Sequence, residues 1–248
     1  MLKQMPQAQL LPKDRTFQQL LVPYLCPYFL FVALSSLPTG WLGSTPTQIV
    51  KLFATATLMA AGWRTYRFGR LTAEHVGVSI LALPLALGAW LGPLFLVKAA
   101  GMMPLGEPVT GDDVHNTLYF GLRLFNSAIL VAIFEELFMR VFVMQWFYQA
   151  GRQRQAKGLL GSLIDTLDQR PAAELKTLPL SVFSVIGTTL VFTAGHPIYA
   201  YPAAVAYFLF TTWLYKKTGS LWVLILIHGL TNLAIGLLVR YGGMHWLW

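Results

Sequence analysis

The feature that most constrains the fold of this chain is a cluster of three charged residues inside an apolar stretch. Glu135, Glu136 and Arg140 lie between the runs SAILVAIF and VFVMQWF. An ionised side chain at the centre of a membrane helix costs roughly 2.5–3.5 kcal/mol on insertion scales. The fold must therefore either let these charges neutralise one another or hold them in a polar site, away from lipid, where they serve a function.

Helical spacing gives the two carboxylates different surroundings. Glu136 and Arg140 are separated by four residues, so they share a helix face and are close enough to pair. Glu135 points about 100° away from Glu136 around the helix, which leaves it as the carboxylate without a partner. Such a group suits a general base or acid. The alternative interpretation is a purely structural polar contact between helices.

The composition places this cluster in a membrane protein. Hydrophobic residues make up 56% of the 248 residues and charged residues 11%, whereas soluble domains carry about 25% charged residues. We therefore expect an all-α, polytopic transmembrane helical bundle with a polar intramembrane cavity. No polar stretch is long enough to be a linker, so residues 1–248 are expected to form a single integral membrane domain. The single cysteine, Cys26, excludes an intrachain disulfide.

Apolar segments of spanning length predict seven transmembrane helices. These segments cover residues 19–37, 47–65, 76–97, 117–135, 178–195, 199–215 and 221–239. The fourth is expected to continue past the carboxylates to about Tyr148, as one long helix or as two pieces, and two pieces would give eight spans. The first follows a charged stretch and lacks a small-residue cleavage site, which indicates a retained span rather than a signal peptide.

Basic residues collect in alternate loops and predict the orientation of the chain. The net charge is +8, yet loops 38–46 and 98–116 together contain one lysine and three acidic residues. By the positive-inside rule, the N-terminus is cytoplasmic in a multi-pass protein of the cell membrane, which we expect to be a bacterial inner membrane. The basic loops indicate contact with the lipid bilayer and not with nucleic acid.

The longest of these basic loops, residues 151–177, contains apolar residues at helical spacing. They are Leu159, Leu160, Leu163, Ile164 and Leu167. Part of this connector is therefore expected to lie at the membrane interface as an amphipathic helix.

Two histidines lie in the later apolar segments. His196 ends the fifth segment and precedes a proline, so we expect it at a helix end with Phe192 packed beside its imidazole. His228 and Asn232 point the same way from the last segment. His228 lies about 10 Å deep at 1.5 Å per residue. Gly229 would permit close approach of a neighbouring helix. Because polar groups in lipid face the bundle interior, these side chains are expected to meet Glu135 in one cavity.

Three motifs in this order resemble a known family. EExxxR, FxxxH and HxxxN, at Glu135–Arg140, Phe192–His196 and His228–Asn232, are similar to motifs of the CPBP intramembrane proteases. That family includes the CAAX prenyl endopeptidases and bacterial relatives linked to bacteriocin immunity. The stretch TGSLW before His228 is also similar, and the resemblance covers about residues 115–240.

The resemblance implies a glutamate-dependent peptidase and a role for each matched residue. Six residues are implied to be functional: Glu135, Glu136, Arg140, His196, His228 and Asn232. Glu135 and His196 would hold and activate a water, while His228 and Asn232 would stabilise the tetrahedral oxyanion. The remaining ion pair would support the site. The resemblance implies no metal and no cofactor, and its substrate would be a small or membrane-anchored peptide or protein, with prenylated CAAX-type peptides as one class.

The order of the spans sets a geometric condition on this site. Strict alternation puts the turn at His196 on the outer side, about sixteen helical residues or roughly 24 Å from the turn before His228. The site can close only if the His196 turn is recessed below the membrane surface, which is permitted where broken helices line a cavity.

Two alternative functions stay open at this point. A zinc metalloprotease could use Glu135, His196 and His228 as ligands, although the sequence contains no HExxH. The second is a transporter, because buried carboxylates and histidines also suit a proton relay, or a scaffold that binds and protects a peptide-processing partner.

Overall fold

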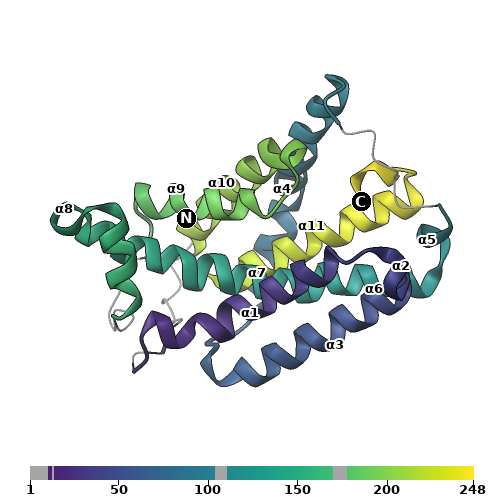
Figure 1. The fold of residues 1–248 in the computed structure, drawn as a ribbon. Helices are drawn as coiled ribbons and strands as arrows, with labels where there is room; N and C mark the ends of the chain where they lie inside the picture. The colour runs from purple at the N-terminus through teal and green to yellow at the C-terminus, as the bar shows by residue number, and fades with distance from the viewer. Residues whose placement is uncertain (1–10, 13, 104–110, 170–177) are drawn as a thin grey trace.

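The computed structural model describes residues 11–12, 14–103, 111–169 and 178–248, and these form helices without any strand (Figure 1). The helices are α1 (Phe17–Ser35), α2 (Thr39–Leu42), α3 (Ser44–Gly62), α4 (Ala73–Ala99), α5 (Gly111–His115), α6 (Thr117–Phe125), α7 (Ala132–Glu136), α8 (Met144–Leu167), α9 (Val182–Ala194), α10 (Tyr201–Thr218) and α11 (Leu221–Tyr241). The predicted all-α helical bundle is confirmed. The basic residues Lys3, Lys13, Arg170 and Lys176 lie outside the described residues.

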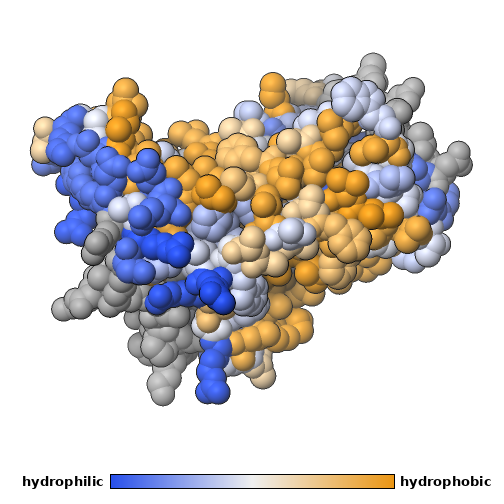
Figure 2. Space-filling model, turned by 60° about the horizontal axis from the view of Figure 1, so that its bottom comes forward, coloured by the Kyte–Doolittle hydropathy of each residue, from blue (hydrophilic) through white to orange (hydrophobic). Residues whose placement is uncertain are grey.

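Among the described residues, three helices are long and apolar enough to cross a membrane, namely α1, α4 and α11. They match three of the predicted spans. α4 carries the most lipid-like surface, with Leu81 82% and Leu96 73% exposed. Figure 2 shows hydrophobic side chains over the middle of the molecule and hydrophilic ones toward its ends. The molecule thus has the surface of a membrane protein, while the count of seven to eight spans and the enclosed cavity remain predictions.

The predicted fourth span is one uninterrupted helical run from Thr117 into α8. Two π-helical segments, Asn126–Val131 and Leu137–Val143, flank α7 on its two sides. The carboxylates Glu135 and Glu136 end α7, so they lie inside a long helix and not at a break between two pieces. π-Helical turns occur frequently at functional sites, and the apolar periodicity of this segment did not predict them.

The predicted connector 151–177 is helical over more of its length than the sequence indicated. α8 continues to Leu167 and kinks at Gly158, where φ is 69°. Beyond the kink the chain packs back on itself, because the Trp146 indole donates to the Leu163 carbonyl at 2.9 Å. Leu160 is 71% exposed, as expected for an amphipathic helix at the interface.

Close helix packing brings the motif-bearing elements together. α11 contacts α7 and the π-helical segment before it, and α10 contacts α4 and α9. A Cβ on Gly229 would lie 2.5 Å from the Ala128 carbonyl oxygen, so only glycine lets α11 approach the π-helix this closely. The predicted role of Gly229 is therefore confirmed.

Candidate active site

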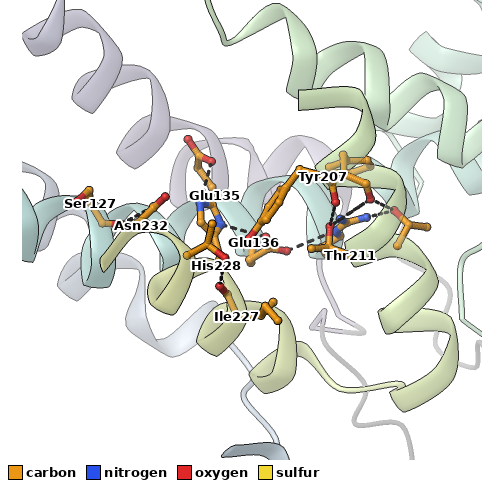
Figure 3. A network of polar contacts seen from close by, with 12 residues as sticks. Ser127, Glu135, Glu136, Tyr207, Thr211, Ile227, His228 and Asn232 are labelled. Carbon is orange, nitrogen blue, oxygen red and sulfur yellow. Dashed lines mark hydrogen bonds and ion pairs between the residues drawn. The ribbon is translucent and has the colours of Figure 1, made fainter. Parts of the chain in front are cut away.

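The imidazole of His228 lies between the two adjacent carboxylates of α7 (Figure 3). Its Nδ1 is 3.1 Å from Glu136 Oε1, and its Nε2 is 3.8 Å from Glu135 Oε2. Because an ionised carboxylate only accepts hydrogen bonds, the Nδ1–H of His228 donates to Glu136. The Nε2 atom then faces Glu135, which makes no hydrogen bond with any other described side chain.

Glu136 also pairs with Arg140 inside the bundle, as its helical spacing predicts. The Arg140 Nε lies 3.3 Å from Glu136 Oε2, and the arginine side chain is 0% exposed. Glu136 is thus held between the guanidinium and the imidazole of His228. Its charge is matched by a neighbour, whereas Glu135 has only the imidazole opposite it.

Helix α10 completes the surroundings of the guanidinium. Arg140 donates to the hydroxyls of Thr212 and Thr211 at 2.5 and 2.6 Å, and to the Phe208 carbonyl at 3.3 Å. The guanidinium carbon also lies 3.6 Å from the centre of the Phe208 ring. A buried arginine is stable only when such donors are paired. This role of α10 was not predicted from the sequence, where two adjacent threonines in an apolar segment are its signal.

His196 lies just beyond the end of α9, where the following proline led us to expect it. Its Nδ1 donates to the Phe192 carbonyl at 2.8 Å, because a carbonyl oxygen can only accept. The Phe192 ring packs beside the imidazole, with ring centres 4.7 Å apart, as predicted. In the neutral imidazole this hydrogen bond leaves Nε2 with a free lone pair.

α9 explains how the His196 turn can be recessed. The helix has 13 residues and is about 20 Å long, which is less than the roughly 30 Å thickness of the hydrocarbon core. The Tyr28 hydroxyl of α1 packs against this turn at the place that a Cβ would take on Gly195, while Gly195 and Pro197 themselves are exposed. The Tyr28 ring in turn contacts Phe134, the residue before Glu135, with ring centres 6.2 Å apart.

Aromatic side chains connect His196 with His228. The Trp90 ring lies 5.4 Å from the His196 ring and 5.7 Å from the Tyr207 ring. Tyr207 contacts His228 edge to face, with ring centres 6.0 Å apart. Within the described residues, His196 makes no hydrogen bond to Glu135. Trp90 and Tyr207 carried no signal in the sequence, because their roles depend on the packing of α4 against α10.

Asn232 lies one turn beyond His228 on α11 and contacts the π-helix before α7. Its Nδ2 donates to the Ser127 carbonyl at 2.8 Å (Figure 3). This bond uses one of the two amide hydrogens and leaves the second hydrogen for another acceptor. The carboxamide is therefore fixed in position while it keeps a donor.

The described residues contain no group of three His, Cys, Asp or Glu side chains placed to hold a metal ion. Glu135, Glu136 and His228 do lie together. Glu136, however, is already engaged by Arg140. The zinc set considered from the sequence requires His196 in addition, and its Nδ1 is bonded to the backbone.

Comparison with known proteins supports one family. Residues 117–234 match a family model described as type II CAAX prenyl endopeptidase Rce1-like. This segment runs from α6 into α11 and contains all six residues implied by the motifs. The chain matches no curated protein and no solved structure. The resemblance to the CPBP proteases is thereby confirmed over residues 117–234.

Proposed function

We propose that this membrane protein, whose residues 117–234 match a family of CAAX prenyl endopeptidases, is an intramembrane peptidase that uses Glu135 as its base. The observation that carries the proposal is the position of His228 between two carboxylates with different partners. Glu136 is neutralised by Arg140, so Glu135 is the carboxylate left to take a proton.

In the proposed reaction, Glu135 and the free Nε2 of His196 hold a water molecule. Glu135 removes a proton from this water as the oxygen attacks the peptide carbonyl, and the proton is later delivered to the leaving amine. His228 in its doubly protonated form can donate Nδ1–H to Glu136 and Nε2–H to the oxyanion. Asn232 supplies the second donor. Glu136 and Arg140 hold His228 in place.

The substrate we propose is a small or membrane-anchored peptide, with prenylated CAAX-type peptides as the first class to test. The protein would lie in a bacterial inner membrane with a cytoplasmic N-terminus. The basic loops support this orientation. Reporter fusions at the two termini would test it.

The test compares wild type with Glu135→Gln on a panel of membrane-anchored and prenylated peptides. We expect wild type to cleave at least one peptide and Glu135→Gln to lose this activity while staying folded. Glu74→Gln is the matched control, because Glu74 is exposed in the first turn of α4. Equal cleavage by wild type and Glu135→Gln would remove the proposed base. Activity lost to a chelator and restored by zinc would instead support a metalloprotease.

A further inference from the structure

A buried lysine lies outside the candidate active site and has no carboxylate partner. Lys51 of α3 is 8% exposed, and within the described residues its ammonium forms no hydrogen bond or ion pair. The Nζ atom lies over the Phe31 ring, 4.2 Å from its centre. A cation–π contact offsets only part of the cost of burying an ammonium. An ionisable group in such a position indicates a functional site.

The charged neighbour of Lys51 is a second cation. Arg123 lies on α6, which packs against α3, and it is one turn before Asn126, which donates to Gln48 one turn before Lys51. The Arg123 guanidinium donates to the Tyr119 hydroxyl at 2.7 Å and lies 4.1 Å from the centre of the Trp248 ring. It pairs with no carboxylate in the described parts of the chain. Two like charges on packed helices repel, and an anion bound between them would relieve the repulsion.

Each of the two cations has a buried polar atom without a hydrogen-bond partner one helical turn further along the chain. Gln48, Lys51 and Thr55 lie on successive turns of α3, and the Thr55 hydroxyl is buried without a hydrogen bond. Asn126 donates to the Gln48 backbone and side-chain oxygens at 3.0 and 3.1 Å, while its own Oδ1 has no partner. A carboxylate could accept from Lys51, from Arg123 and from the Thr55 hydroxyl.

This cationic site is adjacent to the candidate active site. The Phe31 ring under Lys51 also contacts the Phe134 ring, with centres 5.3 Å apart, and Phe134 precedes Glu135. Asn126 precedes Ser127, whose carbonyl accepts the bond from Asn232. Extended residues span about 3.3–3.6 Å each, so three residues beyond a bond cleaved at Glu135 would reach about 10 Å from it.

We propose that Lys51 and Arg123 bind the terminal carboxylate of the peptide substrate and so place the scissile bond a few residues upstream, at Glu135 and His228. The position of the scissile bond rests on the function proposed above. A lipid phosphate is disfavoured as the ligand, because Lys51 lies about 10 Å along α3 from its first residue at the predicted outer surface. A terminal carboxylate is also favoured over an internal acidic residue, because only one extended peptide strand would then have to enter the bundle.

The experiment measures binding, so it does not depend on cleavage. The probe is a dansylated, farnesylated peptide with three apolar residues after the modified cysteine, made with either a free carboxylate or a C-terminal amide. Its dissociation constant is measured with the full-length protein in neutral phosphatidylcholine nanodiscs. We expect wild type to bind the acid about tenfold or more tightly than the amide, as for a charge-assisted contact. Lys51→Met and Arg123→Met should abolish this preference, and Lys51→Arg should retain it.

Lys98→Met is the matched control, because Lys98 also lies 4.2 Å from the centre of an aromatic ring, that of Trp246, but is exposed at the end of α4. It should keep the preference for the acid. A wild type without this preference, or a Lys51→Met variant that keeps it, would overturn the proposal. So would a preference that is lost when phosphatidylglycerol is added, since a lipid phosphate would then occupy the site. A Lys51-dependent preference without any cleavage would support the carboxylate site and contradict the proposed peptidase.

Discussion

Loss of the charge of Glu136 should destabilise the protein, because it leaves the guanidinium of Arg140 buried without a counter-charge. Glu136→Gln keeps the shape of the side chain and an acceptor for His228. Arg140, however, is 0% exposed and cannot reach water. Removing one partner of a buried ion pair costs about 3–5 kcal/mol. Arg140 keeps its hydrogen bonds to Thr211, Thr212 and the Phe208 carbonyl. We therefore expect a loss of about 3 kcal/mol in the free energy of unfolding.

Removal of both charges should recover most of that loss. The hydroxyls of Thr211 and Thr212 accept from Arg140 and also donate to carbonyls one turn earlier on α10, at 3.0 and 2.7 Å. They stay bonded when Arg140 is replaced. The double variant Glu136→Gln/Arg140→Met should therefore unfold within about 1 kcal/mol of wild type, as found when buried ion pairs are replaced by apolar groups.

The assay is equilibrium unfolding in mixed micelles with increasing dodecyl sulfate, followed by tryptophan fluorescence. Wild type, the two single variants and the double variant form a thermodynamic cycle. With about 3 kcal/mol lost in each single variant and about 1 kcal/mol in the double variant, the coupling free energy should be about 5 kcal/mol. Glu74→Gln, at an exposed glutamate, is the control for loss of a carboxylate. A coupling energy near zero, or equal losses for Glu136→Gln and Glu74→Gln, would refute the reasoning.

Three further perturbations test the packing and the chemistry of the site. Gly229→Ala should lower the free energy of unfolding by about 1–3 kcal/mol and reduce cleavage, because its Cβ would lie 2.5 Å from a backbone carbonyl oxygen. Gly77→Ala is the control, because a Cβ on Gly77 meets open space and should leave both quantities unchanged. Thr212→Val should cost about 1–3 kcal/mol in the same unfolding assay by leaving a guanidinium hydrogen unpaired, while Thr212→Ser should be close to wild type. Asn232→Ala should lower kcat about 10²–10³-fold with an unchanged substrate dissociation constant, and a change in binding alone would contradict the proposed oxyanion role.

Local features of the site could be predicted from the sequence where they depend on spacing along one helix. The Glu136–Arg140 pair follows from a separation of four residues, and the structure confirms it at 3.3 Å. The position of His196 beyond a helix end follows from the proline after it. Gly229 could be recognised because a small residue between polar ones suggests close helix packing.

Features that depend on packing between helices could not be predicted. The threonines that bind Arg140 lie about seventy residues further along the chain, as the hydrogen bond to Thr212 shows with a separation of 72. The π-helical segments around α7 could not be recognised from the sequence, because the apolar residues there follow the ordinary helical period of 3.6. The hydrogen positions on His196 and His228 depend on the acceptors that face each Nδ1, which only the fold defines.

The short α9 has a consequence for the bilayer itself. As a predicted span, a helix of about 20 Å would not match acyl chains that form a core of roughly 30 Å, so lipid beside it would thin. Water entering beside α9 would cross less hydrocarbon before it reaches His196. We expect hydrolysis to slow as bilayers of longer acyl chains are used, since the thicker membrane would close this route.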